Sequence, residues 1–163
     1  MSEARYNNFV QPACLWFDGI YDTLDSYEVS GSVVGWGFDR KDKLTRTLHV
    51  ATMPQVPDVT CILFQPIFYQ KVLNGKKFCA GHQNGKSIKT RRGFLVYVQD
   101  YKPDPSDYRQ KKKAPGAYYV KGIVSVTLKS DREDAVVCDP NGYTVFTDVT
   151  KYRDWILDHM KNS

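Results

Sequence analysis

Short apolar stretches alternate with polar ones along most of the chain, and glycine, proline or aspartate separates them. This pattern is typical of short β-strands joined by turns. Pro54 and Pro57 should end one of these strands, because proline has no N–H to donate to a sheet ladder. Strands are predicted over 32–37, 44–53, 76–80, 93–98, 117–128 and 142–146.

Helical spacing is clear only near the C-terminus. Apolar residues between Thr147 and Met160 recur at steps of three and four, which places them on one face of a helix. Thr147 or Asp148 can cap this helix, and Lys161 lies at its end, where the helix dipole favours a cation. The apolar face consists of Val149, Tyr152, Trp155, Ile156 and Met160.

A shorter helix is expected to start near Val59 and run through Phe64, with Asp58 as its cap and Pro66 breaking or restarting it. The predominance of short strands nevertheless predicts an all-β fold class. We expect an antiparallel β-barrel with one C-terminal α-helix.

Composition narrows the class of protein only a little. The chain has 163 residues, of which 42% are hydrophobic and 25% charged, as in an ordinary globular domain. Its apolar runs are too short to span a bilayer, and no secretory signal begins the chain. The net charge of +5 permits weak attraction to polyanions and does not single out nucleic acid.

Four cysteines are widely spaced, at positions 14, 61, 79 and 138. No Cys-x-x-Cys occurs, so zinc ribbons and thioredoxin-type redox sites fit poorly. The spacing suits either a secreted domain with disulfides or a cytosolic one with buried thiols, and composition does not choose between them. Neither a cofactor nor a metal site is indicated, because the acidic residues near Asp131 lack calcium-loop spacing.

Several stretches, in the right order over nearly the whole chain, carry a family resemblance. They are Val10–Leu15 with Pro-x-Cys-Leu, Val33–Gly37 with Gly-Trp-Gly, Phe78–Gly81 with Phe-Cys-Ala-Gly, Gly122–Ser125, Cys138–Pro140 and Phe146–Ile156. Together they resemble the second barrel of a trypsin-like, chymotrypsin-fold serine protease. The last segments look like arthropod immune-cascade members and their inactive homologues. The resemblance implies a crossover-like segment over 1–30 and a barrel with its terminal helix over 31–163.

The resemblance also implies that catalytic residues are missing. The family's histidine base and aspartate belong to a region that this chain does not match. His49, His82 and His159 lie elsewhere in the order and are expected to be surface or hydrogen-bonded core side chains. The chain therefore looks like a pseudoenzyme.

The nucleophile region departs from the family pattern as well. Arg91 falls in the serine slot, Thr90 in the neighbouring aspartate slot and Ser87 in the cysteine slot. A protonated guanidinium offers no nucleophile, and no base of the expected origin is present to activate Ser87. Gly85 and Val126 replace the usual pocket residues. We therefore expect no endopeptidase activity.

The same resemblance assigns the cysteines. Cys61 and Cys79 match the family's local disulfide, and closing this loop of about 19 residues would contribute roughly 3 kcal/mol. Cys138 should be a free thiol, because Ser87 stands in its partner's slot. Cys14 should also be unpaired, because it matches a cysteine that reaches outside the protease core.

The sequence leaves three functions to weigh. The leading one is a non-catalytic homologue that binds a protease, a cofactor or the missing first barrel and regulates a proteolytic cascade; the family implies an extracellular location. The second is a fragment or truncated gene model of a secreted endopeptidase. The third is a polyanion-binding module, using a long loop that holds Arg109, Lys111, Lys112 and Lys113. A lone second barrel would expose an apolar face, which predicts dimerisation, low solubility or an obligate partner.

Overall fold

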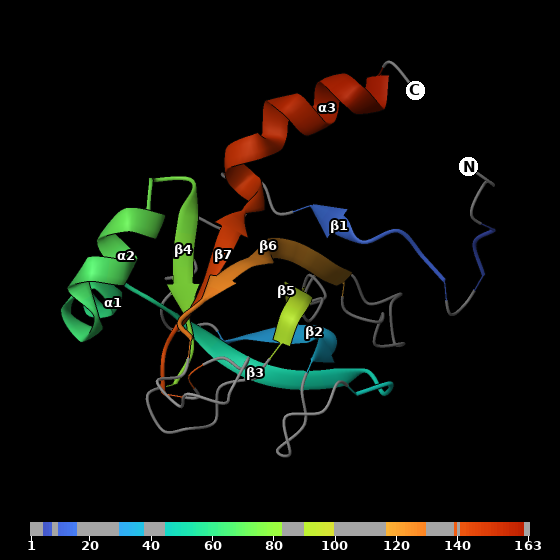
Figure 1. Cartoon of the computed structure of the whole chain (residues 1–163). Coiled ribbons are helices and arrows are strands. Elements are labelled where there is room, and N and C mark those ends of the chain that lie inside the picture. The colour runs from blue at the N-terminus through green and yellow to red at the C-terminus, as the bar shows by residue number, and fades with distance from the viewer. Residues whose placement is uncertain are drawn as a thin grey trace, which may run out of the picture.

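One sheet of seven strands forms the body of the protein, as a computed structural model shows (Figure 1). The strands are β1 (Cys14–Leu15), β2 (Ser30–Gly37), β3 (His49–Val56), β4 (Lys77–Ala80), β5 (Thr90–Gln99), β6 (Ala117–Thr127) and β7 (Thr144–Asp148). The structure describes residues 5–7, 10–15, 30–37, 45–82, 90–99, 117–129, 139 and 141–161, with the backbone alone over 90–99.

The strand order is β1-β6-β5-β2-β3-β4-β7, and β6 also pairs with β7. The pairings are antiparallel except that of β1 with β6, which is parallel. The prediction of a mainly antiparallel sheet followed by a C-terminal helix is confirmed. The closed barrel stays a prediction. The division at residue 30 also stays a prediction, although β1 joins the early segment to β6.

One strand boundary was predicted wrongly. β3 continues through Pro54, which was expected to end it, and stops at Val56, directly before Pro57. The strand tolerates Pro54 because this residue pairs with Ser30, at the very start of β2. Its carbonyl still accepts a hydrogen bond from the N–H of Gly81 at 3.0 Å. Pro54 has no backbone N–H, but it lies at the end of the pairing between β2 and β3, where few ladder hydrogen bonds are lost.

The all-β class is wrong, because two helices follow β3 (Figure 1). They are α1 (Asp58–Phe64) and α2 (Pro66–Val72). Pro66 restarts the helix because it occupies the first turn, where a missing N–H leaves no bond unmade. Gln65 caps α2 by accepting the N–H of Phe68 at 2.7 Å. Asp58 is the first residue of α1 and not its cap.

The predicted C-terminal helix is confirmed in two parts. It begins as a 3-10 turn, η1 (Val149–Tyr152), and continues as α3 (Arg153–Lys161). Asp148 is the cap, since its side chain accepts the N–H of Thr150 at 3.1 Å. None of the helices in the described residues is long and apolar enough to cross a membrane.

Two clusters of buried side chains fill the two faces of β4 and β7. On one face Phe78 stacks on Phe146, with ring centroids 5.4 Å apart, beside Val33, Met53 and Ala80. Gly122 is required next to this stack, because a Cβ there would lie 2.7 Å from the Phe78 ring. The other face holds Cys61, Tyr69, Cys79, Tyr143 and Val145, beneath α1 and α2.

Candidate functional site

The structure places the backbone of the altered nucleophile region on β5. Thr90 pairs with Gly37 and Arg92 with Trp36, so that Arg91 lies at a shift of register between β5 and β2. An extra residue in one strand turns its neighbours out of the regular alternation, as in a β-bulge. Arg91 therefore occupies an irregular point of the ladder. Ser87 and Gly85 lie outside the described residues.

The cysteines are partly described. Cys61 and Cys79 form a disulfide that ties α1 to β4, as predicted, with Cα atoms 6.7 Å apart. Cys14 is exposed and forms no disulfide with another described cysteine. Cys138 lies outside the described residues, as do Arg109, Lys111, Lys112 and Lys113. The free thiols and the basic loop therefore stay predictions.

The three histidines come from separate parts of the chain. His49 begins β3, where its Nε2 lies 3.0 Å from the Thr45 hydroxyl, and it is exposed. His82 follows β4 and is half-buried. His159 lies on α3, and its Nδ1 is 2.8 Å from the carbonyl oxygen of Trp155. The expected surface role fits the exposure of His49 and His159.

A buried ion pair joins β6 to the start of η1, and the sequence reasoning missed it. The Lys121 Nζ donates to both carboxylate oxygens of Asp148, at 3.1 and 3.2 Å. Asp148 also accepts the Thr150 hydroxyl at 2.7 Å. This network fixes the point at which η1 leaves the sheet. The one signal in the sequence was a lysine inside an otherwise apolar strand.

The register explains why Lys121 is buried. Leu95 pairs with Gly122 and Val96 with Val120, so Lys121 has no residue directly opposite it on β5. Such an irregularity can turn a side chain to the opposite face. Lys121 therefore lies on the same face of the sheet as Gly122, which pairs with Asp148 on β7. On this face the Lys121 Nζ lies 5.7 Å from the centroid of the Phe78 ring.

The apolar side chains of α3 are largely exposed to solvent. Of the predicted apolar face, only Val149 is buried, and it precedes α3. Trp155 is 61% exposed and Met160 is 66% exposed, and α3 buries none of its residues. Figure 1 shows α3 extending away from the sheet, with β1 below it. A helix of nine residues is only marginally stable without packing.

An apolar groove of about 300 Å³ lies between α3 and the strands β1 and β6. Its volume is at the lower end of the range for ligand pockets. The groove is lined by Leu15, Val120, Ile123, Thr147, Val149, Tyr152, Trp155 and Ile156.

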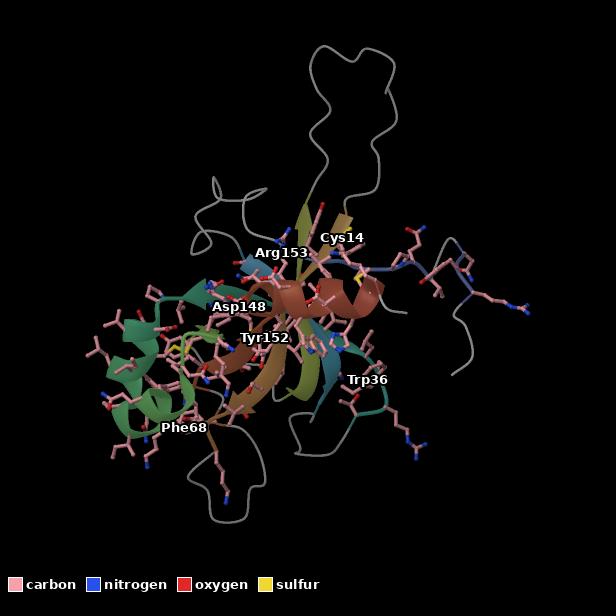
Figure 2. All side chains as sticks on the ribbon, turned by 90° about the horizontal axis from the view of Figure 1, so that it is seen from above. Cys14, Trp36, Phe68, Asp148, Tyr152 and Arg153 are labelled. Carbon is pink, nitrogen blue, oxygen red and sulfur yellow. A yellow bond between two sulfur atoms is a disulfide. The ribbon has the colours of Figure 1, made fainter. Side chains whose placement is uncertain are left out.

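A second hollow, of about 500 Å³, adjoins the groove and shares Tyr152 and Trp155 with it. Most of the side chains around this hollow are charged or carry a hydroxyl. Figure 2 shows Tyr152, Arg153 and Asp148 close together at the base of α3. The second hollow is lined by Lys76, Thr150, Lys151, Tyr152, Arg153, Asp154 and Trp155. We call the two hollows together the α3 groove and its basic rim.

The fold and site thus define a β-rich chain with an open apolar groove beside its terminal helix. The chain is 28% identical to Serine protease gd of Drosophila melanogaster over 184 aligned residues. The alignment covers 94% of this chain and 32% of the relative, so the chain spans about a third of that protein's length. No protein-family model matches the chain. This chain is distantly related to a serine protease.

Proposed function

We propose that this chain is a non-catalytic homologue of a trypsin-like serine protease that acts by binding a protein partner and regulating proteolysis. The observation that carries the proposal is the open α3 groove, with Trp155 61% exposed beside it. Monomeric proteins rarely expose large contiguous apolar patches unless they bind something there. A partner would stabilise α3 by covering it.

The resemblance to the second protease barrel has support in the strand pairing. β6 lies near one end of the sheet order, beside β5, and it also pairs with β7 at the other end. Such a pairing is what a closed antiparallel barrel requires. The distant relation to Serine protease gd favours the same family.

The absence of catalysis rests on the nucleophile slot. Arg91 in that slot provides no hydroxyl or thiol, and its guanidinium stays protonated at any physiological pH. The Cys61–Cys79 disulfide is consistent with the extracellular location that the family implies, because disulfides persist in oxidising compartments.

The experiment is a hydrolysis assay on the purified chain with a fluorogenic peptide library covering all residues at the cleaved position. We expect no hydrolysis above the blank. Ser87→Ala tests the serine nearest in sequence to Arg91, and Ser30→Ala, an exposed serine at the start of β2, is the matched control. Hydrolysis that Ser87→Ala abolishes and Ser30→Ala leaves intact would overturn the proposal.

A further inference from the structure

The α3 groove and its basic rim differ in chemistry although they share two side chains. Among the described residues, the apolar groove is lined by no charged side chain, whereas the adjoining hollow holds Lys76, Lys151 and Arg153. Tyr152 and Trp155 separate the two. One ligand that lies across both hollows must therefore offer an apolar group and a charged group a short distance apart.

The charge of the rim is positive. Lys76, Lys151 and Arg153 are exposed, and among the described residues Asp154 is the one carboxylate that lines the hollow. Asp154 lies 3.6 Å from the Arg153 guanidinium and offsets part of that one charge. Asp148 lies nearby, but the Lys121 ammonium already neutralises it. Within the described part of the chain, the lining of this hollow therefore holds more cations than carboxylates.

Lys76 is also held in place at the rim. Its Nζ lies 5.5 Å from the centroid of the Tyr152 ring, within the range of a cation–π contact. Such a contact leaves the ammonium free to donate hydrogen bonds to an anion. Tyr152 thus positions a cation on one side and lines the apolar groove on the other.

From this juxtaposition we infer that the α3 groove and its basic rim bind an acidic polypeptide segment that inserts one or two apolar side chains. The inference deepens the proposed binding function and rests on it. Complementary charge would steer the segment toward the rim, and burial of its apolar side chain against Trp155 would hold it. A second copy of this chain fits poorly, because each copy carries a net charge of +5.

A sulfated polysaccharide is the competing anion. It would use Lys76, Lys151 and Arg153, but it has no apolar side chain to fill the neighbouring groove. The two ligands are therefore distinguished by the contribution of Trp155, which only the peptide should need.

The probe is a fluorescein-labelled peptide of sequence DEELFEDE, whose binding to the intact chain is measured by fluorescence anisotropy. Two control peptides keep its length: NQQLFQNQ removes the charge, and DEESSEDE removes the apolar pair. We expect binding by the first peptide alone, weakened by 0.3 M NaCl because exposed charges are screened. A heparin octasaccharide is tested in competition.

Protein variants locate the site. Lys76→Gln/Lys151→Gln and Trp155→Ala should each weaken peptide binding about tenfold. The matched controls are Lys71→Gln on α2 and Leu63→Ala on α1, both exposed and remote from α3 in Figure 1, and these should leave it unchanged. Circular dichroism checks that each variant is folded.

Each other result contradicts the inference in a distinct way. No binding of DEELFEDE in 20 mM salt overturns the proposed partner. Binding that heparin displaces and Trp155→Ala does not change indicates a polyanion surface instead. Mass spectrometry of the incubated peptide separates the two proposals: an intact, unbound peptide contradicts only the partner, whereas a cleaved peptide contradicts the non-catalytic function.

Discussion

The two helical regions of this protein, α1 with α2 and η1 with α3, are held in opposite ways. α1 and α2 are only seven residues long, yet each packs one fully buried side chain against the sheet, Cys61 from α1 and Tyr69 from α2. α3 is longer, at nine residues, and buries none. Figure 1 shows the first pair lying beside β4 and the last helix extending away from the sheet.

The comparison teaches that helix length and sequence amphipathicity do not decide where a helix packs. α1 is fixed by a covalent bond, and α2 by a buried tyrosine whose hydroxyl bonds to the backbone of Tyr143. η1 is fixed at its start by its cap, Asp148, whereas α3 beyond it buries none of its residues. The first region is therefore packed against the sheet, whereas the second is anchored only at its start.

The largest expected effect comes from removing the disulfide. Cys61→Ala/Cys79→Ala should lower the free energy of unfolding by about 3 to 4 kcal/mol, because the denatured chain gains the entropy of an open loop and two buried sulfur atoms are lost. Urea denaturation at pH 7 measures it. Cys14→Ala is the control, since Cys14 is exposed, and it should change stability by less than about 0.5 kcal/mol. Equal midpoints for the two variants would show that α1 is not held covalently.

Breaking the ion pair beneath α3 should have the next largest effect. Lys121→Met leaves the Asp148 carboxylate buried without its cation, which should cost about 3 kcal/mol. Lys129→Met, an exposed lysine just after β6, should be nearly neutral. In a double-mutant cycle, the variant that carries both Lys121→Met and Asp148→Asn should lose much less stability than the sum of the losses in the two single variants. Additive losses would mean that the pair does not fix the start of η1.

The third prediction concerns Tyr69. Its hydroxyl donates to the Tyr143 carbonyl and accepts the Tyr143 N–H, both at 2.9 Å. Tyr69→Phe leaves both backbone groups buried without a partner, which should lower the free energy of unfolding by about 2 kcal/mol at pH 7. Tyr118→Phe is the control, because Tyr118 is 60% exposed.

The pH dependence of the same tyrosine has a definite sign. Burial raises the pKa of Tyr69 from 10.0 to about 12 in the folded protein. Its contribution to stability is therefore complete below pH 10 and is lost as the pH rises from 10 towards 12. The wild type should lose stability more steeply than Tyr69→Phe over this interval, as urea denaturation at a series of pH values would show. Parallel curves would contradict the buried hydroxyl.

The sequence predicted the strands β2 to β7, the terminal helix and the Cys61–Cys79 disulfide, because alternation, helical spacing and family motifs are local signals. The two-residue strand β1 was missed. The end of β3 was misjudged because whether Pro54 ends a strand depends on the neighbouring strand. The burial of Lys121 was not predicted for a similar reason. It follows from a register shift between β6 and β5, and no local sequence pattern encodes such a shift. The sequence predicted the apolar face of α3 but not its exposure, since periodicity reveals an apolar face and not what covers it.

The smallest expected effect sharpens the comparison most. Trp155→Ala removes a large aromatic side chain, yet it should change the free energy of unfolding by no more than about 0.5 kcal/mol, because Trp155 is 61% exposed. The same substitution should reduce the fluorescence of bound anilinonaphthalene sulfonate, which needs apolar surface. Leu63→Ala, at a 77% exposed position on α1, should be equally neutral for stability and should leave the dye signal unchanged. A buried aromatic residue would cost about 3 kcal/mol or more on the same change. A loss of that size at Trp155 would mean that α3 packs on the protein as α1 and α2 do, and the groove would then be part of the core rather than a binding surface.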